Sequence, residues 1–323
     1  MVWHLSQAGP VDDIKRNVEE VKAHVAKFSK PDLYLAVRTL LITAALYAGF
    51  LAAYPYTTKH WALWAAAAIL RAGVNVRTFI IFHDCCHGSF FRSGWANMIV
   101  GRIAGGLTCT SWSAWVKMHN VEHHIHHGKD ILFFATVPGL VFLITGVHNG
   151  KLPMMDQMVP SQPKFVLASM DPIDRVLPTL LPALQAWAGY ALHGSSWLWF
   201  QLAFYTLGST MGFMLFHLQH FAHVPDLYFD IPKDQHDRDL ASLMGEFYIP
   251  VHPGVVQYHH IHHFSTRVPS YRIRSCHISA PPATWRYIKY LNLKTELQSF
   301  LLVMWNEDLH RFESFPELNW LLG

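Results

Sequence analysis

Two long apolar stretches lie close together in the first hundred residues. Residues 33–54 and 61–82 are each long enough to cross the roughly 30 Å hydrocarbon core of a bilayer, and only a short turn separates them. A second pair, residues 176–192 and 197–216, is joined by an equally short turn. The pattern predicts four transmembrane helices arranged as two hairpins.

Polar and helix-breaking residues inside these stretches need an explanation. Arg38 lies near the start of the first stretch, where its long side chain can reach the interface. Arg71 and Arg77 weaken the second stretch as a membrane span. Pro178 and Pro182 distort the third stretch, which membrane helices tolerate. The four-span prediction therefore depends on how these side chains are accommodated.

The segments outside the apolar stretches are polar. Residues 11–30 carry charges at helical spacing and predict a surface or interfacial helix within an N-terminal arm, residues 1–32. Residues 221–323 mix polar and aromatic residues with short apolar stripes, and we expect them to form a helical cap. The sequence thus predicts an all-α integral membrane protein, with a membrane domain of residues 33–220 between arm and cap.

Composition agrees with a partly embedded chain and singles out one residue type. Hydrophobic residues make up 51% of the 323 residues and charged residues 15%, against roughly 25% charged in an average soluble domain. The 25 basic and 22 acidic residues nearly balance, which does not favour a nucleic-acid partner. Histidine occurs 23 times, and it is the commonest metal ligand in proteins. The four cysteines show no metal-site or disulfide spacing, and the N-terminus has no signal-peptide pattern.

The histidines gather at the ends of the predicted spans. His83 and His87 end the second span at a spacing of four residues, which places both imidazoles on one face of a helix. In the cap, His259, His262 and His263 share a face in the same way. A fourth, looser group follows the fourth span at a spacing of three residues: His217, His220 and His223.

The second cluster places five histidines within nine residues. His119, His123 and His124 form an HxxxHH pattern, whereas His123, His126 and His127 form HxxHH. Either frame brings imidazoles to one side of a helix. The residues alone leave the choice open.

The number of clustered histidines indicates which metal they hold. Counting two, three, one and three histidines from the four groups gives nine imidazoles. A zinc ion typically binds only four ligands, or three and a water. Imidazole also suits iron, and nine nitrogens around two open-coordinate ions favour a di-iron centre that reacts with O2. The carboxylates that could orient the ligand imidazoles, by interacting with the ring nitrogen that faces away from the metal, are Asp84, Glu122 and Asp130.

The common metal site also constrains the topology. A span at residues 131–147, which contain Pro138 and Gly139, would put the third cluster on the opposite side of the membrane from the first two. We therefore expect this stretch to be re-entrant or interfacial. Lysines and arginines crowd the N-terminal arm and are nearly absent from the hairpin turns, so the termini and the histidine clusters are expected to face the cytosol.

The motifs resemble those of the membrane fatty-acid desaturases, in particular the acyl-lipid omega-6 (delta-12) type. The resemblance rests on residues 77–91, 101–128, 216–223 and 258–273, and it extends from about residue 35 to residue 317. It implies a four-span helical fold with a cytosolic cap and a di-iron centre. It also implies a reaction in which O2 and two electrons from cytochrome b5 or ferredoxin leave a cis double bond and water.

The resemblance assigns the individual ligands. By motif position they are His83, His87, His119, His123, His124, His220, His259, His262 and His263. The frame beginning at His119 is preferred because Trp115 stands four residues before it, as in the family. The alternative ligands are His126, His127, His217 and His223. Candidate walls of an acyl tunnel are Trp112, Trp115, Phe133, Phe134, Phe213 and Phe216.

Alternatives of the same and of other classes remain. Residues 255–257 depart from the asparagine-containing sequence usual before the third box, so a di-iron hydroxylase or conjugase is an alternative outcome. The HxxEH pattern from His119 to His123 would suit a membrane zinc peptidase, but it leaves the other clusters unused. A metal transporter would place ligands near the middle of the bilayer, whereas these lie at span ends.

The expected partners follow from the chemistry. They are an acyl lipid, the membrane and a separate electron donor, because no haem domain accompanies the histidine boxes. The expected location is a multi-pass position in a membrane, which for a eukaryotic source would be the endoplasmic reticulum.

Overall fold

The computed structural model describes two separate parts of the chain. The described residues are 11–117, 119–120, 171–220, 247–248, 258–286, 289–290, 302–306 and 311–314. They belong to two compact units, residues 31–214 and residues 1–30 with 215–323. The stretch 131–147, expected to be re-entrant, lies outside the described residues.

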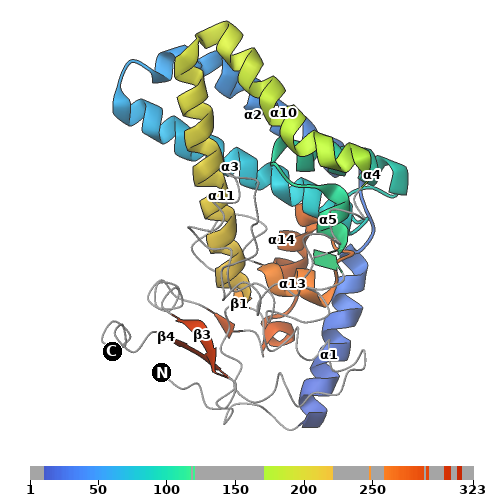
Figure 1. Cartoon of the computed structure of the whole chain (residues 1–323). Coiled ribbons are helices and arrows are strands. Elements are labelled where there is room, and N and C mark those ends of the chain that lie inside the picture. Colours follow the sequence, from blue (N-terminus) through green and yellow to red (C-terminus); the bar gives the residue numbers. More distant parts are fainter. Residues whose placement is uncertain are drawn as a thin grey trace. The chain divides into compact units, whose positions relative to one another are not determined.

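Long helices cover the four apolar stretches (Figure 1). They are α2 (Leu33–Thr57), α3 (Trp61–Cys86), α10 (Pro172–His193) and α11 (Ser195–His220). Among the described helices, α2 and α3 are apolar and long enough to cross a membrane by length and composition. The third stretch begins earlier than predicted, because Asp171 and the proline after it start a helix that the apolar run alone does not mark.

Local residues set the ends of these helices. The Asp32 carboxylate accepts a hydrogen bond from the backbone N–H of Leu35 at 3.1 Å and begins α2. The Asp171 carboxylate does the same for Ile173 at 2.9 Å and begins α10. Gly194, with φ of 72°, separates α10 from α11. This backbone conformation is open mainly to glycine, which explains why the second hairpin turns there.

The second hairpin and the first meet in an aromatic core. Gly189 of α10 lies so close to Trp197 of α11 that a Cβ atom at position 189 would be 2.0 Å from the indole Nε1. The core then continues into α2, α3 and α11 through Tyr54, Ala67, Ala68, Ala72, Trp197, Phe200 and Phe204. Large apolar side chains on the outer faces of α2, α10 and α11 stay exposed, as expected of helices surrounded by lipid.

Arg71 is accommodated inside α3 by a polar and two aromatic partners. Its side chain is 1% exposed, and Nη1 donates to the Asn75 side-chain oxygen at 2.7 Å. The guanidinium lies between the rings of Tyr47 and Phe204, 3.9 and 4.3 Å from their centroids. Arg77 donates from Nε to a threonine hydroxyl of α2 at 2.9 Å. Neighbouring helices therefore supply the partners that the isolated apolar stretch lacks.

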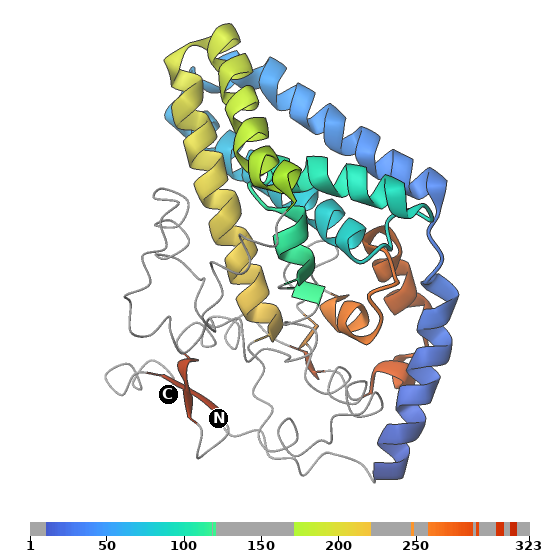
Figure 2. The same cartoon turned by 45° about the vertical axis from the view of Figure 1, so that its right-hand side comes forward.

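Two helices between the first and second histidine clusters were not predicted (Figure 2). α4 (Gly94–Leu107) begins where the Ser93 hydroxyl accepts from a backbone N–H, and it packs against α3 and α10. α5 (Trp112–Lys117) follows after a tight turn. A Cβ atom at Gly101 would lie 1.9 Å from the Trp112 ring, so a glycine is needed for α4 to pass this close to α5.

The other unit begins with a helix that is part of its core. α1 (Val11–Val25) continues as the 3₁₀ helix η2 (Ala26–Phe28). Val18, Val21 and Val25 recur along one face and are at most 1% exposed. They pack with a cluster from the second half of the chain, namely Tyr258, Ile261, Val268, Ile273, Cys276 and Trp285. The charges that indicate a surface helix therefore lie opposite a buried valine stripe.

The remaining helices of this unit are short. α13 (His259–Phe264) carries the third histidine box, and α14 (Ser270–Ser279) and the 3₁₀ helix η5 (Pro282–Trp285) follow it closely. Helices this short do not persist by themselves in water, so packing within the unit must hold them.

Besides the predicted helices, the described part of this unit contains two small sheets that were not predicted. β1 (Phe247–Tyr248) pairs in parallel with β2 (Lys289–Tyr290). β3 (Leu302–Asn306) pairs antiparallel with β4 (Arg311–Ser314). Strands of two to five residues are too short for a period-two pattern to stand out, and the β1–β2 pairing joins segments far apart in sequence.

Candidate metal centre

The end of α3 presents two histidines on one face. His83 lies in the last turn and His87 is the C-cap residue, so their rings are one turn apart with centroids 4.7 Å from each other. Gly88, with φ of 68°, ends the helix directly behind them. His83 is 6% exposed. The predicted i, i+4 pair is therefore present.

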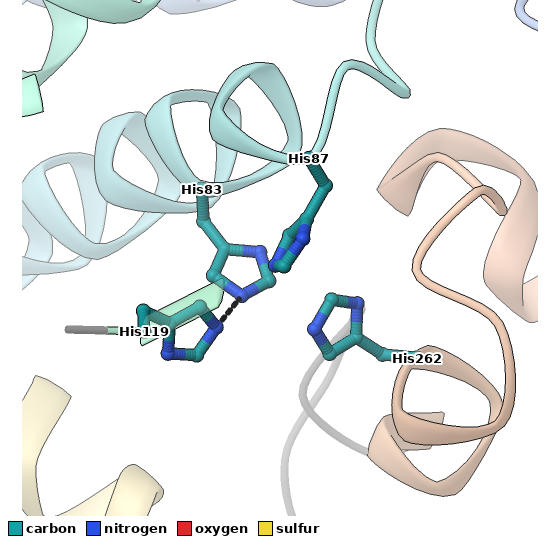
Figure 3. Close-up of side chains that lie close together, drawn as sticks. All are labelled: His83, His87, His119 and His262. Atoms are coloured by element: carbon teal, nitrogen blue, oxygen red, sulfur yellow. Dashed lines mark hydrogen bonds between the residues drawn. The ribbon is translucent and has the colours of Figure 1, made fainter. Parts of the chain in front are cut away.

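His119 joins this pair from the segment after α5. Its Nε2 lies 2.8 Å from Nε2 of His83, and its ring centroid lies 5.3 Å from that of His87. It is 3% exposed. Figure 3 shows the three imidazoles directed toward one another; it also draws His262, which belongs to the other unit. The candidate ligand nitrogens lie within 4.8 Å of one another, as the ligands of a metal ion must.

Two contacts hold His119 in this position. The Trp115 indole stacks on the His119 ring with centroids 4.7 Å apart and an angle of 23° between planes. Trp115 in turn packs edge-on against Phe79 of α3 at 5.0 Å. The Asn120 side-chain nitrogen donates to the carbonyl of Cys86 at 2.9 Å. The second cluster is thus fixed to the end of α3 by side chains on both sides of His119.

The Trp115 stack gives a first prediction. Replacing Trp115 with leucine should weaken metal binding by about two- to tenfold, because an aromatic pair contributes roughly 0.5–1.5 kcal/mol to the placement of the imidazole. Trp115→Phe keeps a ring and should retain most of the affinity. The measurement is the dissociation constant for added Fe(II) of the two purified variants side by side. Equal affinity of Trp115→Leu and the unsubstituted chain would show that the stack is dispensable.

Of the three carboxylates predicted to orient the ligand imidazoles, Asp84 lies within the described residues. It is 2% exposed, and its Oδ1 lies 3.7 Å from Nδ1 of His83. That separation exceeds a hydrogen bond but is close enough for electrostatic attraction to a polarised imidazole. Glu122 and Asp130 lie outside the described residues.

A charged network connects α4, α5 and α10. Arg102 Nε lies 2.8 Å from Asp174 Oδ1, and Arg102 Nη2 lies 3.1 Å from Asp171 Oδ2. The other oxygen of Asp174 accepts from the backbone N–H of Ser113 at 3.2 Å. Asp174 is 1% exposed. Its carboxylate therefore caps the first turn of the helix that leads to His119.

The third box lies in the other unit. His262 of α13 is 3% exposed and His260 is 2% exposed. Burial lowers the pKa of His260 well below its usual value, with a further lowering from the neighbouring His277. Burial also lowers the pKa of His277 to about 4. Both imidazoles are thus neutral near neutral pH, the form in which histidine binds metals and accepts hydrogen bonds.

The other predicted ligands fall where side chains are not described. His259 and His263 lie in α13, and His217 and His220 in α11, with only their backbone described. Fully outside the described residues are His123, His124, His126, His127 and His223. Of the predicted tunnel residues, Trp112 packs against Gly101 and Trp115 against His119. Phe133 and Phe134 and the side chains of Phe213 and Phe216 are likewise not described.

A cluster of imidazoles that could hold a metal ion therefore lies at the end of a long apolar helix. A family model for fatty acid desaturases matches residues 59–291, well over half of the chain. The chain belongs to the fatty acid desaturase family. It is therefore an oxidoreductase of lipid metabolism rather than a zinc peptidase or a metal transporter.

Individual relatives agree with this assignment. A fatty acid desaturase of Bacillus subtilis (strain 168) is 26% identical over 340 residues, covering 94% of this chain and 92% of that protein. An sn-1 oleoyl-lipid 12-desaturase of a Picosynechococcus species is 24% identical over 275 residues, covering 73% of each. A chloroplastic omega-3 fatty acid desaturase of Brassica napus is 34% identical over 92 residues, 28% of this chain and 21% of that protein.

Proposed function

We propose that the chain is an acyl-lipid desaturase that inserts a cis double bond at a delta-12 (omega-6)-like position, using O2 and two electrons. The observation that carries this proposal is the meeting of His83, His87 and His119, which come from two separate histidine boxes. The name of the Picosynechococcus relative supports an acyl lipid as the carrier and position 12 as the site.

The proposed cofactor is a pair of iron ions. Imidazoles whose nitrogens lie within 4.8 Å of one another fit such a centre, because imidazole nitrogen is a ligand that iron accepts readily. The proposed ligands are His83, His87, His119, His123, His124, His220, His259, His262 and His263. When bound, the irons would activate O2, which with two electrons and two protons takes up two hydrogens from neighbouring methylenes and leaves as two waters.

The chain's own residues position this centre and keep it dry. Trp115 and Asn120 fix His119 against the end of α3. Asp84 favours the orientation of His83 in which Nδ1 faces the carboxylate and Nε2 faces the centre. Burial of His83 and His119 excludes water, which would otherwise compete with the acyl chain.

The proposed topology has four membrane spans, with both termini and the histidine boxes in the cytosol. Its parts are the arm of residues 1–32, the membrane domain of residues 33–220 and the cap of residues 221–323. The lengths of α10 and α11 and their exposed apolar faces support spans three and four. The electron donor is a separate protein, cytochrome b5 or a ferredoxin.

The test is the fatty-acid profile of yeast that expresses the chain, measured by gas chromatography and mass spectrometry. We expect new dienes with the unsubstituted chain, none with His83→Ala, and unchanged dienes with His60→Ser, a control at the opposite end of α3. Dienes should also disappear when O2 is withheld.

Other products would change the proposal in defined ways. Hydroxylated chains would move the reaction to hydroxylation, and conjugated dienes would make the chain a conjugase. Purified protein that contains one zinc and no iron would overturn the di-iron centre.

A further inference from the structure

One histidine of the third box has no place in the proposed ligand set. His260 lies between the proposed ligands His259 and His262 in α13, and it is 2% exposed. Its Nε2 lies 3.2 Å from Nδ1 of His277, which belongs to α14. His260 therefore hydrogen-bonds through Nε2 to a side chain that lies seventeen residues further along the chain.

His277 is itself held on several sides. Its ring stacks on the Trp285 indole with centroids 5.1 Å apart and an angle of 8° between planes. The indole Nε1 donates to the backbone carbonyl of His277 at 3.0 Å. The Tyr258 ring lies 4.7 Å from the imidazole. On the same turn of α14, the carbonyl of Cys276 is 2.8 Å from Nε2 of His24 in α1. A rigid imidazole thus faces His260.

The direction of the hydrogen bond follows from the second nitrogen of His260. Nδ1 of His260 is buried and finds no hydrogen-bond partner within the described part of the chain. A buried N–H without an acceptor is rarer than a buried lone pair without a donor. The proton is therefore assigned to Nε2 of His260, which donates to Nδ1 of His277.

The geometry of α13 shows what this hydrogen bond controls. At about 100° per residue, His259, His262 and His263 occupy one arc of the helical wheel, about 100° wide. Ile261 lies opposite that arc and is 0% exposed, in the core of the unit. His260 lies at the boundary between the core side and the ligand side. Fixing His260 therefore fixes the rotation of the helix about its axis.

We propose that His277, acting through His260, is a positioning residue that sets the rotation of α13 and thereby aims the metal ligands of the third histidine box. A helix of six residues cannot hold this rotation alone, since its own hydrogen bonds are too few. Metal ligands have to be placed within about 0.5 Å and 10–20° to bind well. The inference rests on the proposed ligand set of the desaturase.

The test compares two substitutions of His277 in the full-length protein purified in detergent. His277→Phe keeps a ring against Trp285 but removes the acceptor. His277→Asn supplies a side-chain oxygen close to the position of Nδ1 and should rescue. Iron per chain, the affinity for added Fe(II) and the Mössbauer spectrum of the bound iron are measured beside the melting temperature.

We expect His277→Phe to weaken iron binding by about 10–100-fold and to alter the spectrum, since outer partners of metal ligands act on this scale. His277→Asn should recover most of the binding. Asn17→Val is the matched control, because it removes the hydrogen bond from α1 to the Thr284 carbonyl of η5 without touching His260 or His277. It should lower the melting temperature and leave the iron spectrum unchanged.

The outcomes separate this inference from the proposed function. Two irons in the unsubstituted chain, with the same affinity and spectrum in His277→Phe, would overturn the positioning role alone. Failure of His277→Asn to rescue would do the same. No iron in the unsubstituted chain would overturn the metal centre and this inference with it. If His277→Phe does not fold, His260→Gln, which keeps a donor near the position of Nε2, is compared with His260→Leu, and equal iron binding by the two would refute the role.

Discussion

Replacing His119 with alanine should reduce diene formation by at least about 100-fold, whereas replacing His126 or His127 should leave it within a few-fold of the unsubstituted chain. Loss of an outer partner of a metal ligand already costs about 10–100-fold, so loss of a ligand costs at least as much. His119 is assigned this role because its Nε2 lies 2.8 Å from that of His83 and its ring is held by Trp115. The experiment therefore decides between the two frames of the second box.

The measurement is the diene fraction in yeast lipids together with iron per purified chain. In the preferred frame, His119→Ala and His124→Ala lose both, and His126→Ala and His127→Ala keep both. His123 belongs to either frame and does not discriminate. Retained iron and activity in His119→Ala, with loss in His126→Ala, would select the alternative frame and leave the contact between His119 and His83 as a packing feature.

The sequence predicted those parts of the fold that depend on neighbours along the chain. Long apolar runs mark α2 and α3 because a helix surrounded by lipid needs no polar face. The pairing of His83 and His87 follows from the helical period alone. That His119 joins them was expected only from the requirement that the boxes share a metal, and the structure places it there.

Other parts depend on residues far apart and could not be predicted. Arg71 argues against a membrane span when read alone, but Tyr47 and Phe204 from two other helices enclose its guanidinium. α4 was missed because its glycines lower helix propensity, although Gly101 is needed where Trp112 packs. The signal that could have found this helix is the Ser93 cap before an apolar run.

The role of Asp174 was also hidden, since nothing near it in sequence points to the metal centre. Its carboxylate binds Arg102 of α4 and the N-terminus of α5, some sixty residues earlier. Through this network, an acidic side chain of α10 accepts a hydrogen bond from the first turn of α5. This connection leads to the prediction with the largest expected effect on stability.

Replacing Asp174 with alanine should lower both stability and activity. Removing one partner of a buried ion pair costs roughly 3–5 kcal/mol, and we expect the lower end because Arg102 is 17% exposed and keeps Asp171. A loss of about 3 kcal/mol corresponds to a fall in melting temperature of about 6–12 °C for a unit of this size. Thermal unfolding in detergent measures this change, and lipid analysis measures the diene yield.

The double substitution Arg102→Met with Asp174→Leu separates the two roles of the carboxylate. It removes both charges, so no charge is left buried without its partner, and most of the melting temperature should return. The backbone N–H of Ser113 still lacks its acceptor, so α5 stays uncapped and His119 less well placed. Diene formation should therefore remain low in the double variant. If activity recovers together with stability, Asp174 acts only through the fold; if stability alone recovers, the carboxylate also positions α5 for the metal site.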